Sequence, residues 1–169
     1  MCKITKYTVF ETDWGFFGLA GGNRGLIRTE LPAKSRQGVC ERLLDGLPQC
    51  SCDKNLYPEL QRQIKAYFEG IYDLKPESVE LDLAGISAFA KRIYQCCLHL
   101  RPSETISYGK LAALAASPAA ARAAGTVMAK NPLPLIIPCH RVIRANGDLG
   151  NFSASGGRDM KERLLEHEN

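Results

Sequence analysis

The sequence predicts a mixed α/β (α+β) protein, with a small N-terminal sheet-and-helix domain followed by a mostly helical C-terminal domain that contains a helix-turn-helix. The first part of the chain places β-rich runs around a glycine-rich turn, and the second half shows apolar residues at helical spacing. The charge also changes along the chain. Residues 1–86 hold 11 Lys and Arg against 12 Asp and Glu, whereas residues 87–169 hold 11 against 6. We therefore expect two domains, 1–84 and 87–169, with a linker at 82–85.

A small sheet should open the N-terminal domain. Residues 14–20 and 26–31 are β-rich and flank a glycine-rich turn at 21–25, which is typical of a β-hairpin. Residues 3–10 are a plausible third strand. Two helices are expected next, over 35–47 and from Pro58 to a cap at Gly70. They should bury Val39, Leu43, Leu44 and Leu47, and Leu60, Ile64, Tyr67 and Phe68.

Ser87 can cap the first helix of the C-terminal domain, which should bury Phe89, Ile93, Cys97 and Leu100. A short helix over 110–116 and a second one to Lys130, with Ser117 as its N-cap and Pro118 as its first residue, suggest a helix-turn-helix. An ordinary α-hairpin in the core is the alternative. The second helix favours the former, because residues 119–125 carry almost no side-chain bulk apart from Arg122. Such a helix can approach a DNA minor groove, roughly 6 Å wide, very closely.

The last forty residues are less regular. The apolar, proline-rich segment 131–138 cannot continue a helix and should hold Cys139 in a fixed place. The segments expected after it are a short strand at 141–143, a turn at 146–147, a loop at 150–157, and a final helix from Arg158 that turns Leu164 and Leu165 inward.

Composition limits the class of protein. No stretch approaches the roughly 18 apolar residues of a membrane helix, and the first residues do not resemble a secretion signal. We expect a soluble cytoplasmic protein, or a nuclear one in a eukaryote, whose seven cysteines stay reduced. The basic second half fits a phosphate-facing surface, although a merely solvated basic face is the alternative.

Cys139 is the candidate nucleophile. A thiol attacks carbon only as the thiolate, so it needs a nearby base or positive charge, and His140 and Arg141 follow it directly. Adjacent side chains on a strand point to opposite faces, so we expect a bridging water or a tight turn between Cys139 and His140. A Cys-His pair is by itself weak evidence for catalysis.

Several separate segments together identify a family. Ile-Ser-Tyr-Gly-Lys-Leu-Ala at 106–112, Ala-Ala-Arg-Ala at 120–123, Asn131-Pro132, and Ile-Pro-Cys-His-Arg-Val-Ile at 137–143 strongly resemble the O6-alkylguanine-DNA alkyltransferases in order and spacing. The resemblance is close from about Phe89 to Glu168. In the first half it extends only to the plan of strands, turn and helix.

The resemblance implies roles for individual residues. Cys139 corresponds to the alkyl acceptor, His140 to the base that removes its proton through a water, Glu168 to the acid that orients the histidine, and Asn131 to a residue that braces the site. Tyr108 corresponds to the residue that presses on the target phosphate, and Arg122 to the finger that replaces the flipped nucleotide. Further DNA-binding candidates are Gly109, Ser117 and Arg141, and the substrate-pocket candidates are Val142, Gly150, Asn151, Phe152 and Ser153.

The chain departs from the family pattern in two places. Phe152 stands where many relatives have a tyrosine, and the loop that follows is longer, which puts lesion preference in question. Thr126 replaces a common second glycine. Some relatives hold a structural zinc in the first domain; here Cys2, Cys40, Cys50 and Cys52 are candidates, but the spacing of Cys50 and Cys52 favours plain thiols and no metal.

The predicted function is DNA repair by stoichiometric transfer of an alkyl group from O6-alkylguanine, or O4-alkylthymine, in double-stranded DNA to Cys139. We expect a monomer that needs no cofactor, because the nucleophile is internal. The alternatives are a non-catalytic lesion-binding protein of the same fold, a helix-turn-helix regulator, and a cysteine hydrolase with turnover. Cys139 argues against the first, and the alanine-rich helix against the second.

Overall fold

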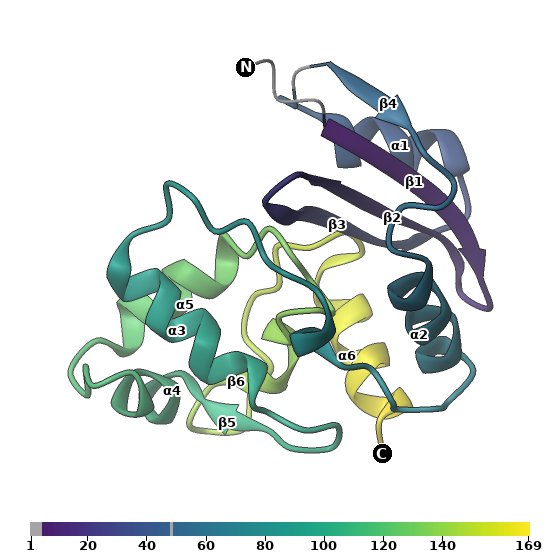
Figure 1. Ribbon diagram of the computed structural model, residues 1–169. Helices are drawn as coiled ribbons and strands as arrows, with labels where there is room; N and C mark the ends of the chain where they lie inside the picture. Colours follow the sequence, from purple (N-terminus) through teal and green to yellow (C-terminus); the bar gives the residue numbers. More distant parts are fainter. Residues whose placement is uncertain (1–4, 48) are drawn as a thin grey trace. The chain divides into compact units, whose positions relative to one another are not determined.

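The computed structural model describes residues 5–47 and 49–169, and the chain divides into two compact units, 1–82 and 83–169. Figure 1 shows a sheet with two helices in the first unit and a mainly helical second unit. The α+β class is confirmed. No helix in the described part of the chain is long and apolar enough to span a membrane.

The sheet of the first unit has four strands in the order β3-β2-β1-β4. β1 (Thr5–Thr12), β2 (Gly15–Gly22) and β3 (Gly25–Ala33) are antiparallel, as the hairpin pattern predicts. The turn between β2 and β3 is tighter than expected, because only residues 23 and 24 lie outside the strands. β4 (Cys50–Cys52) pairs in parallel with β1 and has no sequence signal, since three residues cannot show an alternating pattern.

Two α-helices and a 3-10 turn, η1 (Pro76–Ser78), follow in the described part of the first unit. α1 (Arg36–Leu44) begins at its N-cap Ser35, whose side chain accepts a hydrogen bond of 3.0 Å from the Gly38 N–H, and it ends three residues earlier than expected. Its Val39 and Leu43 pack with β-sheet residues, while Leu44 and Leu47 are only partly buried. α2 (Pro58–Phe68) buries all four predicted residues.

The second unit opens with α3 (Ala88–Leu98), capped by Ser87 as predicted. Ile93 and Cys97 are buried, whereas Phe89 and Leu100 are only partly covered. The buried Tyr94 ties this helix to the following ones, because its hydroxyl donates a 3.0 Å hydrogen bond to the carbonyl of Val127.

The predicted helix pair is present as α4 (Tyr108–Leu114) and α5 (Ala121–Ala129), which pack against each other. The cap predicted for the second helix is wrong, and both helices begin at other residues than predicted. α4 begins two residues early, because the Ser107 side chain accepts from the Lys110 N–H. α5 begins three residues after Pro118, because the Ser117 hydroxyl donates back to the Ala115 carbonyl and does not cap a new helix.

The final segments surround Cys139. The short strands β5 (Ile106–Ser107) and β6 (Val142–Ile143) pair in parallel, and between residues 133 and 142 every residue is buried. α6 (Gly157–His167) closes the unit, with Leu164 buried and Leu165 half-buried. α6 packs on η2 (Cys139–Arg141), a single turn of 3-10 helix.

Candidate active site

Cys139 lies at the start of the 3-10 turn and is 5% exposed. Its N–H donates a 2.7 Å hydrogen bond to the Ile137 carbonyl, so the backbone bends sharply on both sides of Pro138. A tight turn thus replaces the extended geometry that would separate Cys139 from His140. The site therefore contains a buried thiol whose backbone is constrained, together with the group of charged side chains described next.

This group consists of a buried carboxylate that holds two basic side chains. Glu168 Oε1 accepts 2.8 Å contacts from His140 Nε2 and Arg141 Nη2, and Glu168 Oε2 accepts a 3.0 Å bond from Arg141 Nε. The side chains of His140 and Glu168 are fully buried. The Ser103 hydroxyl donates to the Glu168 carbonyl, which fixes the end of α6. The histidine ring is therefore held in one orientation through its Nε2 atom.

The electrostatics of this group follow from burial and pairing. Burial alone would raise the pKa of Glu168, but the hydrogen bonds from His140 and Arg141 outweigh it and hold the pKa well below its usual range. Burial lowers the pKa of His140, against the opposing effect of Glu168. At neutral pH the carboxylate is charged and the imidazole is neutral, so the imidazole is able to accept a proton.

His140 Nδ1 is the atom that can take that proton. It is buried, and no hydrogen-bond partner for it exists in residues 5–47 and 49–169. Buried polar atoms are nearly always paired with protein or water. With Nε2 bonded to Glu168, the free Nδ1 is the acceptor side of the ring.

Asn131 braces the segment before the nucleophile. Its side-chain amide donates a 2.8 Å hydrogen bond to the Ile137 carbonyl, and its oxygen accepts from the Leu133 N–H at 2.9 Å. The pKa of Cys139 is raised by burial, while hydrogen bonding by Asn131 and the positive charge of Lys161 act to lower it. Asn131 is thus tied by two hydrogen bonds to the segment that leads to Cys139.

Lys161 is a site residue that the sequence analysis missed. It is fully buried in α6, and its amine donates two 2.6 Å hydrogen bonds, to the carbonyls of Val142 and Leu149. The amine also lies 5.8 Å from the ring centre of Tyr108 and 6.0 Å from that of Phe152. Burial lowers its pKa to about 8. The helical spacing of residues 161, 164 and 168 was the available signal, because it places Lys161 on the buried face of α6.

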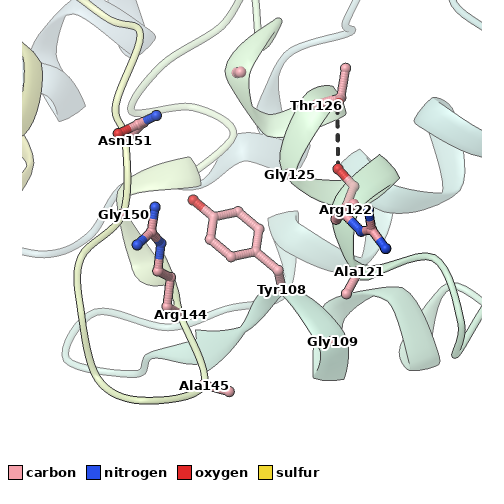
Figure 2. Close-up of a pocket in the computed structure, with 11 residues that line it drawn as sticks. Tyr108, Gly109, Ala121, Arg122, Gly125, Thr126, Arg144, Ala145, Gly150 and Asn151 are labelled. Atoms are coloured by element: carbon pink, nitrogen blue, oxygen red, sulfur yellow. Dashed lines mark hydrogen bonds between the residues drawn. The ribbon is translucent and has the colours of Figure 1, made fainter.

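A cavity of about 640 Å³ lies beside the helix pair, a size within the roughly 300–1,000 Å³ of typical ligand sites. Figure 2 shows Tyr108 in its middle, between Arg122 of α5 and Arg144 of the turn after β6. The small residues of α5 form one wall, since Ala121, Gly125 and Ala129 recur at helical spacing. The cavity is lined by Tyr108, Gly109, Ala121, Arg122, Gly125, Thr126, Ala129, Arg144, Ala145, Gly150 and Asn151.

The predicted residues divide between these places. Tyr108, Gly109, Arg122, Gly150 and Asn151 line the cavity. Four other candidates do not line it. Val142 is buried and its carbonyl accepts a hydrogen bond from the Lys161 amine, while Phe152 is half-buried. The Ser153 hydroxyl donates to the Ala129 carbonyl, and Ser117 lies in the turn between α4 and α5.

Arg141 requires a correction. It was expected to contact DNA, but it is 7% exposed, and its guanidinium is used by Glu168 and by the Leu100 carbonyl at 2.6 Å. A cation that is desolvated and paired in this way cannot also reach a phosphate at the surface. Its role in the site is to hold Glu168, the residue that bonds to His140.

The cysteines of the first unit do not form a metal centre in the described part of the chain, where no group of three or more His, Cys, Asp or Glu residues could hold an ion. Cys40 and Cys52 are free thiols there, and the Cys50 thiol contacts the Leu47 carbonyl at 3.9 Å. Cys2, the fourth candidate, lies outside the described residues.

Known proteins are similar to this chain in sequence and in fold. The sequence model described as 6-O-methylguanine DNA methyltransferase, DNA binding domain, matches residues 88–169. The methylated-DNA–protein-cysteine methyltransferase of Rattus norvegicus is 34% identical over 99% of this chain and 83% of its own length. The chain belongs to this methyltransferase family.

Relatives from other organisms extend the comparison. The methylated-DNA–protein-cysteine methyltransferase of Methanosarcina acetivorans is 34% identical to this methyltransferase over 96% of the chain and 97% of its own length. Among solved structures, that of Mycobacterium tuberculosis OGT in complex with DNA has a TM-score of 0.78 at 33% identity and covers 96% of this chain and 92% of its own. The family, the fold class and the DNA-repair alkyltransferase activity predicted from the sequence are confirmed.

Proposed function

We propose that this methyltransferase removes the alkyl group from O6-alkylguanine in double-stranded DNA and keeps it on Cys139. The observation that carries the proposal is the buried His140, whose Nε2 is bonded to Glu168 and whose Nδ1 has no hydrogen-bond partner in the described residues and can therefore act as a base. The same set of groups, Cys139, His140 and Glu168, serves O4-alkylthymine only if that smaller base fills the site.

The chemical step balances without a cofactor. The Cys139 proton passes to His140 Nδ1 through a bound water, and Glu168 stabilises the imidazolium that forms. The thiolate sulfur attacks the alkyl carbon in line, the bond from that carbon to O6 breaks, and the guanine leaves with the bonding electrons and takes up a proton. The product is a thioether with no ready leaving path, so each protein molecule repairs one lesion.

The cavity beside the helix pair supplies the DNA contacts in this proposal. Tyr108 presses on the phosphate of the target nucleotide and rotates it out, and Arg122 fills the space left in the stack. Extrusion costs a few kcal/mol, part of which the inserted side chain offsets. The small side chains of α5 permit the close approach that both contacts require. We propose that Gly109 and Ser117 contact the backbone nearby and that the protein acts as a monomer, in the cytoplasm or, in a eukaryote, in the nucleus.

Phe152 and Ser153 belong to the base-binding part of the proposal. The Phe152 ring is held near the Lys161 amine, and Ser153 anchors the loop to the end of α5. The other residues of the proposed base-binding part are Val142, Gly150 and Asn151. A phenylalanine at this position stacks on a purine but gives it no hydrogen bond.

Intact-protein mass spectrometry tests the proposal. After incubation with duplex DNA containing O6-methylguanine, the protein should gain one methyl group on Cys139 and stop at one equivalent. Cys139→Ala should bind the duplex without gaining mass. Binding by the wild type with no mass change would instead support the lesion-binding alternative, and repeated turnover would support a hydrolase.

A further inference from the structure

The cavity beside Tyr108 holds a second guanidinium that the proposed function does not use. Arg144 follows β6 and lines the cavity opposite Arg122, with the Tyr108 hydroxyl end on the Arg144 side (Figure 2). The sequence offers no motif for it, since it is one exposed arginine among several in the second half.

Tyr108 and Arg144 converge on one point. A Cβ atom placed on Gly150 would lie 3.5 Å from the Tyr108 hydroxyl oxygen and 3.6 Å from Arg144 Nε. Gly150 has a positive φ of 69° and no side chain, so the space between the two donors stays open. One tetrahedral phosphate group placed there can accept hydrogen bonds from both residues.

The backbone around Arg144 is fixed before any ligand arrives. Its N–H donates to the Asp148 carbonyl at 2.8 Å, and its carbonyl accepts from the Gly147 N–H at 3.0 Å. Asp148 is the nearby carboxylate, but its Oδ1 is used by the Gly150 N–H at 2.7 Å and contacts Arg158 at 3.4 Å. Within the described residues Arg144 forms no ion pair, so its guanidinium is available.

The charge of the cavity selects an anion. Its lining contains two arginines and the hydroxyl or amide groups of three other residues, and it contains no Asp or Glu. A phosphodiester carries one negative charge and only acceptor oxygens on its free edge, which matches this set of donors.

We propose that Arg144 and the Tyr108 hydroxyl together clamp the phosphate of the extruded nucleotide, so that Arg144 is a positioning residue for transfer. The inference rests on the proposed function and deepens it. Arg122 then acts on the DNA stack from one side of Tyr108, while Arg144 holds the displaced backbone on the other. The clamp acts only on DNA, because a free alkylated base has no phosphate.

The test compares Arg144→Ala with Arg163→Ala, which removes an exposed arginine of α6 that does not line the cavity. Binding to a lesion-bearing duplex is measured over a salt series, with Cys139→Ala added to each variant so that no transfer occurs. For Arg144→Ala we expect affinity to fall roughly 10-fold and the slope of log K against log salt to drop by about one, since one phosphate contact is lost. Arg144→Lys should restore the slope.

A second readout separates positioning from simple folding effects. In proteins that keep Cys139, methyl transfer from the duplex should slow with Arg144→Ala at subsaturating DNA, while the reaction with free O6-methylguanine base should proceed at the wild-type rate. The clamp is refuted if Arg144→Ala matches Arg163→Ala in affinity and slope, or if it slows both substrates equally. Wild-type protein that gains no methyl group from the duplex would refute the proposed function itself, whatever Arg144 does.

Discussion

Replacing Glu168 with glutamine is the sharpest perturbation of the relay. The substitution keeps the shape of the side chain but removes the charge that pairs with Arg141, which is itself buried, and that bonds to the His140 ring. Removing one partner of a buried ion pair costs about 3–5 kcal/mol, because the other charge stays desolvated and unpaired. Glu166→Gln on the same helix is the matched control, since Glu166 is exposed.

The measurement is urea unfolding followed by far-UV circular dichroism. We expect Glu168→Gln to lose about 3–5 kcal/mol of unfolding free energy and Glu166→Gln less than about 0.5 kcal/mol. Adding Arg141→Met to Glu168→Gln should recover part of the loss, since the unpaired buried charge is then gone. Equal stability of the two glutamine variants would show that the pair contributes nothing and would refute the reasoning.

The pH dependence of the same comparison has a definite sign. The folded-state pKa of Glu168 lies below its unfolded value of about 4.3, so the folded state favours the carboxylate. Its contribution is therefore present above about pH 4.3 and is lost as the pH falls below that value. The difference between wild type and Glu168→Gln should shrink in acid and stay constant from pH 6 to 7.

Three further substitutions test other parts of the site. Lys161→Met should slow transfer to Cys139 in single-turnover assays by removing a positive charge near the thiol. Because the folded pKa of Lys161 is lowered to about 8, the unfolding free energy of the wild type should rise relative to that of this variant between about pH 8 and 10. A difference in unfolding free energy that does not change with pH would contradict the lowered pKa of Lys161. Ser107→Ala should cost about 1 kcal/mol in urea unfolding by removing the cap of α4, whereas Ser117→Ala, which removes no cap, should cost less; the reverse order would contradict the observed start of α5. Gly150→Ala should lower DNA affinity more than Gly147→Ala, because both positions have positive φ but only the first places a Cβ beside Tyr108 and Arg144; equal binding by the two variants would argue against the shape of the cavity.

The sequence predicts those parts of the molecule whose signals are local. The hairpin, α2 and α3 follow from side-chain patterns and from caps such as Ser87. α2 buries all four predicted residues, whereas only two of the four residues predicted for the α3 region are buried. The start of α5 does not, because a serine followed by a proline is compatible with either a cap or a turn. The hydrogen bond from Ser117 to Ala115 decides between them, and it depends on the three-dimensional path of the chain.

Long-range features of the site required either a resemblance or the structure. Glu168 lies 28 residues after His140, and only the family motif connects the two before the distance is known. Arg141 and Lys161 show the opposite difficulty. Charged residues are seldom buried unless they are paired. Arg141 was therefore expected at the surface, and Lys161 in the polar helix α6 was not predicted as a site residue, although both are buried. Their partners are backbone carbonyls and the side-chain carboxylate of Glu168, and the sequence does not show where these lie.

The burial of Cys139 and His140 explains how a thiol that reacts only once can avoid reacting with other compounds before it meets its substrate. Burial raises the pKa of Cys139 and lowers the pKa of His140, so the resting pair is a neutral thiol and a neutral imidazole, with no standing thiolate. A neutral thiol is a poor nucleophile towards the electrophiles of the cell. In the proposed mechanism, proton transfer to His140 becomes favourable as the sulfur–carbon bond forms, because the charged Glu168 is already in place to stabilise the imidazolium. The activation of Cys139 is therefore coupled to the presence of an alkyl group in line with it, which is the condition that a protein consumed by its own reaction needs.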